Sequence, residues 1–242
     1  MSDSTQSTQN KVHGHSTHTH DYAAENQKHF DKEAPQVDAN PQFQEGARDI
    51  ARAMRVRYPS LFNKEETTVM DFACGTGLVS REISPHVKSL LGVDVSQGMV
   101  DQFNLRVSDQ GVPLEEIKAT RAELKGDGTE LDGQKFDLVI CTAAYHHFAN
   151  VEEITRILAS FLKPGGSLLV VDILYNETLH TDPDLPEHFH QVVAHKNGFS
   201  EAEMRALFEQ GGLGAFEFTE AVTQIKILTK EVNFFLAKGI KV

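Results

Sequence analysis

Apolar and polar residues alternate along the chain in blocks that predict helices and strands in turn. Between residues 42 and 58, Phe43, Ala47, Ile50 and Met54 recur at helical spacing, which predicts an amphipathic helix. Beyond residue 67, short apolar runs such as TVMDFA are each followed by a helical pattern, so we expect buried strands. These strands are expected at 68–73, 89–93, 116–119, 136–141 and 167–173, and helices at 21–31, 42–58, 77–83, 98–110 and 151–162.

Strands that alternate with helices on this scale indicate a parallel sheet covered by helices. The last part of the chain differs, because a helix at 200–210 precedes two strand-like runs, 215–228 and 232–237, which predict an antiparallel hairpin. We therefore expect an α/β fold with a seven-stranded, mostly parallel sheet, an antiparallel C-terminal hairpin and helices on both faces. Between the first two helices, Pro35 and Pro41 indicate a connector.

Two regions of different composition are expected. Residues 1–20 are rich in Ser, Thr, Gln and His and nearly free of apolar residues, which predicts a disordered tail. The histidines of this tail lack a rigid scaffold, so we expect no metal site there. Residues 21–242 are expected to form a single domain, with N-terminal helices over 21–60.

Charge and composition exclude several classes of partner. The chain has 35 acidic and 23 basic residues and a formal net charge of −12, which disfavours nucleic acid and anionic membranes. No apolar run approaches the ~18 residues of a membrane span, and the cytoplasm is the expected location. The only two cysteines, Cys74 and Cys141, follow strand-like apolar runs, so we expect no disulfide framework.

The sequence DFACGTG, from Asp71 to Gly77, carries a strand directly into a turn of small residues and then a helix. Glycine at such a turn lets a nucleotide-like ligand approach the backbone. A tight turn without a ligand would look the same. The next strand, however, ends at Asp94, where α/β nucleotide folds place an acid against ribose hydroxyls. The two signals together favour an adenosine-containing ligand.

Four motifs in order, DFACGTG, LLGVDVSQGMV, FDLVICTAAYHHF and LKPGGSLLVVD, resemble the class I S-adenosylmethionine-dependent methyltransferases, especially those of ubiquinone and menaquinone biosynthesis. The resemblance covers residues 65–175 strongly and implies a Rossmann-like fold with S-adenosylmethionine as cofactor. It also implies that residues 174–199 form a cap over the substrate. Residues that the resemblance assigns to the cofactor are Asp71, Ala73, Gly75, Gly77, Asp94, Val95, Met99, Ala122, Glu123 and Thr142.

Three positions depart from the family's pattern. Ala73 stands where the family has glycine, Arg121 where it commonly has an acid, and Val37 where a tyrosine is often found. These departures motivate an alternative, a non-catalytic S-adenosylmethionine-binding subunit that regulates a partner enzyme. A protein methyltransferase is not supported, because AAYHH follows the fourth strand instead of an acceptor motif of the Asn-Pro-Pro-Tyr type.

His146 and His147 follow the fourth strand, at the sheet edge where open α/β folds bind ligands. Either imidazole could take a proton from the methyl acceptor, since an unperturbed histidine titrates near ~6.5. In a purely structural interpretation, one histidine caps the following helix and the other packs beneath the sheet edge. We expect in-line methyl transfer to a small molecule; the sequence specifies neither the acceptor nor the oligomeric state.

Overall fold

The computed structural model describes residues 20–181, 187–227 and 230–242. Seven strands form one sheet in the order β3-β2-β1-β4-β5-β7-β6. The strands are β1 (Thr68–Phe72), β2 (Ser89–Asp94), β3 (Ile117–Arg121), β4 (Phe136–Thr142), β5 (Leu162–Ile173), β6 (Leu213–Ile227) and β7 (Lys230–Lys241). Strands β1 to β5 pair in parallel, whereas β7 runs antiparallel to both β5 and β6. The predicted Rossmann-like sheet with an antiparallel C-terminal hairpin is confirmed.

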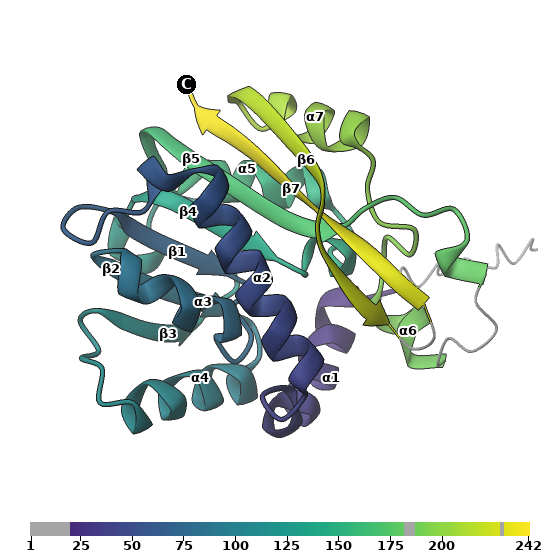
Figure 1. Cartoon of the computed structure of the whole chain (residues 1–242), viewed down its shortest axis with the longest axis horizontal. Helices are drawn as coiled ribbons and strands as arrows, with labels where there is room; N and C mark the ends of the chain where they lie inside the picture. The colour runs from purple at the N-terminus through teal and green to yellow at the C-terminus, as the bar shows by residue number, and fades with distance from the viewer. Residues whose placement is uncertain (1–19, 182–186, 228–229) are drawn as a thin grey trace, which may run out of the picture.

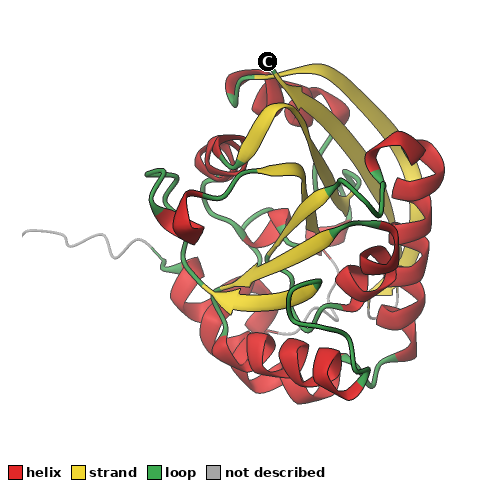
Figure 2. Ribbon diagram, turned by 90° about the vertical axis from the view of Figure 1, so that its left-hand side faces the viewer, coloured by secondary structure: helices red, strands yellow, loops and turns green. Residues whose placement is uncertain are grey.

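Helices cover both faces of this sheet, as Figures 1 and 2 show. They are α1 (Tyr22–Val37), α2 (Pro41–Arg57), α3 (Leu78–Ile83), α4 (Gln97–Asp109), α5 (Val151–Ser160), α6 (Glu187–Val192) and α7 (Glu201–Gln210). Helices α2, α3 and α4 pack into the hydrophobic core on one face, and α5 and α7 into the core on the other. None of the helices in the described ranges combines the length and apolar character needed to cross a membrane.

The central strands contribute to both cores because successive side chains point to opposite faces. In β4, Leu138 and Ile140 belong to the core under α2 to α4, whereas Val139 and Cys141 belong to the core under α5 and α7. All four side chains are fully buried. This explains why the strand appears in the sequence as a continuous apolar run rather than as an alternating one.

The connector between the first two helices is shorter than predicted. Pro35 lies inside α1, and Pro41 is the first residue of α2, so only residues 38–40 separate the two helices. A proline in the last turn of a helix removes one hydrogen bond from its end, whereas a proline at the first position removes none. The packing of α1 on α4 and α6 outweighs that loss.

The predicted tail lies outside the described residues over 1–19. His20 is described, and its Nε2 donates a hydrogen bond to the carbonyl of Gln191, 2.6 Å away. Helix α1 then runs beside α6 and α4, past the carboxyl ends of the parallel strands (Figure 1). This position brings α1 to the sheet edge at which α/β folds bind ligands.

Candidate functional site

The turn after β1 adopts the left-handed conformation at three alternate residues. Ala73, Gly75 and Gly77 have φ angles of 56°, 54° and 81°. A Cβ atom added to Gly75 would meet no atom within 4 Å, so this residue borders open space. A Cβ atom added to Gly77 would lie 2.5 Å from the ring of Phe103. Gly75 therefore leaves room for a ligand, whereas Gly77 permits close packing against α4.

Asp71, at the end of β1, is a buried carboxylate with one hydrogen-bonded oxygen. Its Oδ2 accepts a hydrogen bond from Ser80 Oγ at 2.5 Å, while Oδ1 has no partner among the described residues. Burial raises the pKa of Asp71 to about 7, and the nearby carboxylate of Asp94 adds to the rise. An unpartnered buried oxygen of this kind favours a hydrogen-bond donor or a positive charge beside it.

Asp94 joins the turn after β1 to the turn after β2. Its Oδ2 accepts a hydrogen bond from the amide of Gly75 and its Oδ1 one from the amide of Ser96, both at 2.9 Å. Burial raises the pKa of Asp94. A carboxylate oxygen has two lone pairs, so each oxygen can accept a further hydrogen bond, for example from a ribose hydroxyl. The fixed carboxylate is therefore suited to bind the ribose of an adenosyl group.

The turn after β3 lies against the same carboxyl ends. The amide of Ala122 donates to the carbonyl of Asp94 at 3.0 Å, and Arg121 Nε donates to the carbonyl of Val95 at 3.0 Å. Glu123 is exposed. The guanidinium of Arg121, which replaces the acid common in the family, is thus held beside β2 by a backbone contact.

His146 lies in the short 3-10 turn Tyr145–His147 after β4, and it contacts a buried acid on β5. Its Nδ1 is 2.8 Å from Oδ1 of Asp172, which is completely buried. Burial alone would raise the pKa of Asp172, but His146 and the amide of Ile173 lower it. Because the carboxylate accepts, Nδ1 of His146 carries the proton of this hydrogen bond, and Nε2 is the ring nitrogen that Asp172 does not engage.

His147 has a different environment. Its Nδ1 donates to the carbonyl of Val192 at 2.8 Å, and burial together with the neighbouring His146 lowers its pKa to about 3. The ring also contacts Phe30 of α1 edge-on, with centroids 5.2 Å apart. The lowered pKa favours the neutral form of His147, whose ring packs against α1. The predicted helix cap is wrong, because Asn150 caps α5 by accepting from the amide of Glu153.

Tyr145 precedes the two histidines and is completely buried. Its hydroxyl lies 3.2 Å from Oγ1 of Thr155, and burial raises its pKa. The side chain of Tyr145 therefore belongs to the core beneath the site rather than to the site itself.

Comparison with known proteins relates this chain to methyltransferases. Residues 69–166 match the methyltransferase domain family. An uncharacterized methyltransferase of Schizosaccharomyces pombe is 36% identical over 162 residues, which cover 65% of this chain and 57% of that protein. The ubiquinone biosynthesis O-methyltransferase of Chelativorans sp. is 30% identical over 48% of this chain and 43% of that protein. Over residues 69–166 the chain is thus similar to methyltransferases, in agreement with the resemblance to the class I enzymes. Methyltransferases of this class take S-adenosylmethionine as their cofactor.

Solved structures support the fold of the methyltransferase domain. The YcgJ protein of Bacillus subtilis matches with a TM-score of 0.59 at 20% identity, covering 78% of this chain and 98% of that one. Magnesium protoporphyrin IX methyltransferase from Synechocystis, solved with bound S-adenosylhomocysteine, gives 0.59 at 16% identity and covers 83% and 84%. The chain spans less than two thirds of the length of the curated relatives it matches.

The methyltransferase fold brings most of the predicted cofactor residues to one edge of the sheet. Ala73, Gly75 and Val95 lie on the turns after β1 and β2. Asp94 ends β2, and Thr142 ends β4, which is adjacent to β1. Met99 is buried in the first turn of α4, and its amide donates to Ser96 Oγ. Met99 therefore contributes to the site through the position of α4.

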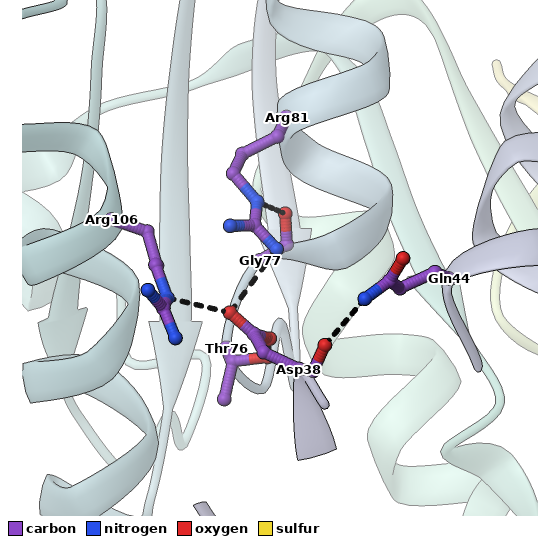
Figure 3. Close-up of polar contacts among 6 residues, drawn as sticks. All are labelled: Asp38, Gln44, Thr76, Gly77, Arg81 and Arg106. Carbon is purple, nitrogen blue, oxygen red and sulfur yellow. Dashed lines mark hydrogen bonds and ion pairs between the residues drawn. The ribbon is translucent and has the colours of Figure 1, made fainter. Parts of the chain in front are cut away.

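Sequence reasoning missed three acids of the candidate site. Asp172 is the last residue of the motif LKPGGSLLVVD, and its position as a lone acid in an apolar strand could have indicated a functional role. Asp31 lies on α1 and binds Ser96 in the turn after β2. Asp38 caps the end of α1 and binds Thr76 in the turn after β1 (Figure 3). No local sequence pattern marks them, because their partners lie 38 or more residues away.

A cavity of about 540 Å³ lies next to Asp38. Asp38 and side chains of α2, α3 and α4, among them Arg48, Arg81 and Glu82, line it. None of the residues predicted to bind the cofactor is among its lining residues. This cavity is therefore distinct from the predicted cofactor cleft.

Proposed function

We propose that this chain is an S-adenosylmethionine-dependent methyltransferase that transfers a methyl group in line to a small molecule. The observation that carries the proposal is the convergence of Gly75 and Asp94, whose amide and carboxylate are hydrogen-bonded 2.9 Å apart at the open turn. The unpartnered Oδ1 of Asp71 lies at the end of the adjacent strand and suits a cationic ligand. The open turn at Gly75 leaves room for the cofactor, Asp94 suits its ribose, and the buried carboxyl of Asp71 suits its positively charged end.

When bound, S-adenosylmethionine supplies a methyl group on a sulfonium, and the thioether leaves without needing a proton. Asp71, Ala73, Gly75 and Gly77 would then hold the methionine end, and Asp94 with Val95 the ribose. The rest of the cofactor would be bordered by Met99, Ala122, Glu123 and Thr142. The chief task of the protein is alignment, which can be worth ~7–11 kcal/mol of the barrier.

His146 and Asp172 are proposed to act on the methyl acceptor. Nε2 of His146 can remove a proton from an attacking oxygen, nitrogen or sulfur, and Asp172 stabilises the imidazolium that results. The segment 187–199 covers this histidine, since the amides of Ala194 and His195 both donate to the carbonyl of His146. This segment is the proposed cap of the acceptor site.

The name of the relative from ubiquinone biosynthesis supports a small organic acceptor. The alternative of a non-catalytic regulatory subunit is not favoured, because the matched relatives carry methyltransferase names. Ala73, which motivated that alternative, has a φ of 56°, so it adopts the left-handed conformation that glycine favours.

Isothermal titration with S-adenosylmethionine, repeated in competition with S-adenosylhomocysteine, tests the donor site. Wild-type protein should bind, and Asp94→Ala should abolish binding while Asp109→Ala, an exposed acid at the end of α4, should not. Absence of heat with folded wild-type protein would contradict the proposal. Transfer of a labelled methyl group to phenolic and amine acceptors would then identify the acceptor class.

A further inference from the structure

Helix α1 and its C-terminal cap bring two carboxylates to the two turns that are proposed to hold the cofactor. Asp31 and Asp38 are seven residues apart, a spacing that places both on one face of a helix. Oδ1 of Asp31 accepts from Ser96 Oγ at 2.6 Å and from the amide of Gly98 at 3.0 Å. These hydrogen bonds lower the pKa of Asp31, so the carboxylate is ionised at the start of α4.

The approach of α1 to α4 is so close that it depends on glycine. A Cβ atom added to Gly98 would lie 3.0 Å from the carbonyl oxygen of Asp31, which is tighter than ordinary packing. The contact between the two helices therefore involves backbone as well as side chains. It fixes the beginning of α4 relative to α1.

Asp38 binds the turn after β1 in the same way (Figure 3). Its Oδ1 accepts from Thr76 Oγ at 2.5 Å, and its Oδ2 accepts from Arg81 at 3.3 Å and from Arg106 at 3.0 Å. Gln44 donates to the backbone carbonyl of Asp38 at 2.6 Å. The carboxylate is only 10% exposed, and the guanidinium groups of Arg81 and Arg106 compensate its charge.

These contacts close a ring around the cofactor turns. Asp38 holds Thr76, Thr76 is bonded in the chain to Gly75, and the amide of Gly75 donates to Asp94. Asp94 accepts in turn from the amide of Ser96, whose hydroxyl donates to Asp31. Both turns are thus fixed from the inside by Asp94 and from the outside by α1.

We propose that Asp38 and Asp31 are positioning residues for the cofactor: they hold the turns after β1 and β2 in the conformation that binds S-adenosylmethionine. This inference rests on the proposed function. Neither carboxylate needs to touch the cofactor, because each acts through a turn residue, Thr76 or Ser96. A site held in its binding conformation loses less conformational entropy on binding, which increases affinity.

Titration of S-adenosylhomocysteine into matched variants tests the proposal. Asp38→Asn and Thr76→Val should each raise the Kd about tenfold, whereas Thr76→Ser, which keeps the hydroxyl, should stay within about twofold of wild type. Asp109→Asn removes the same charge from the same cavity without removing a hydrogen bond and should also stay within about twofold. The double variant D38A/T76V should bind no more weakly than D38A, because D38A already removes the oxygen that accepts the Thr76 hydrogen bond.

A merely structural role gives a different result. If Asp38→Asn lowered the melting temperature but left the Kd unchanged, or if the effects of D38A and T76V multiplied, the proposal would be overturned. Amide exchange of residues 73–77 without cofactor provides a second measurement, and it should be faster in D38N than in D109N. If wild type bound no cofactor, the proposed function would fail; equal exchange rates would instead refute the positioning role. If D38N does not fold, Asp31→Ala takes its place, because it removes the oxygen that accepts from Ser96 and Gly98; amide exchange is then measured at residues 96–99.

Discussion

The buried carboxylate of Asp71 should make the folded chain less stable as the pH rises. Asp71 is 1% exposed, and only one of its oxygens has a hydrogen-bond partner among the described residues. Its pKa is about 7 in the folded chain against an ordinary value of 3.8. Between these two values the folded chain keeps a proton that the unfolded chain has lost. Unfolding releases this proton, so the free energy of unfolding falls as the pH rises through that range.

The size of the effect follows from the same two values. Each pH unit between them is worth about 1.4 kcal/mol, so the free energy of unfolding falls by about 4 kcal/mol across the range. For a chain of this length, 1 kcal/mol changes the melting temperature by roughly 2–4 °C, which gives about 8–16 °C in total. A single surface carboxylate would have no comparable effect.

Asp71→Asn isolates this contribution because it removes the titration and can still accept the hydrogen bond from Ser80. The melting temperature of the variant relative to wild type should rise by about 8–16 °C between about pH 4 and about pH 8. Asp109→Asn, an exposed acid, should show no such change. If the difference between D71N and wild type stayed constant to about 2 °C over this range, the assignment of a buried, protonated Asp71 would be refuted.

Three further predictions follow from single contacts. Gly77→Ala should lower the melting temperature more than Gly75→Ala, since its Cβ meets Phe103, whereas Gly75→Ala should chiefly raise the Kd for S-adenosylmethionine. His146→Gln should slow methyl transfer by ~10²–10⁴-fold without changing that Kd, as single-turnover rates and titration would show. Ser200→Ala removes the capping box of α7 and should cost about 1 kcal/mol of unfolding free energy in chemical denaturation.

The sheet and the glycine-rich turn could be predicted because their signals are local. The central strands β1, β4 and β5 each contain a short apolar run, and Leu138 to Cys141 of β4 are apolar on both faces because both faces are covered. Asp94 could be predicted as well, since it ends such a run. The extent of α1 could not, because Pro35 favours a helix end locally, and only packing on α4 and α6 overrides that preference.

The division of roles between the two histidines required the structure. His146 and His147 are neighbours on the same turn, and their residue types are identical. The difference between them arises from long-range contacts: Asp172, 26 residues further on, holds His146, and the carbonyl of Val192, 45 residues further on, holds His147. Both contacts use Nδ1, but only His146 has a carboxylate that could stabilise an imidazolium, so the sequence could name the pair but could not favour His146 as the proposed base.

The two acids of α1 show why affinity for a cofactor is harder to predict than its binding motif. The motif around Gly75 specifies a shape, and a turn rich in small residues can adopt other shapes at little energetic cost. Asp94 restrains the turn from within, and Asp38 restrains it through Thr76 from a helix that precedes the first strand. Helix α1 lies outside the matched domain of 69–166. The proposed positioning role predicts that a chain with the same motif but without these acids has the same fold and binds the cofactor more weakly.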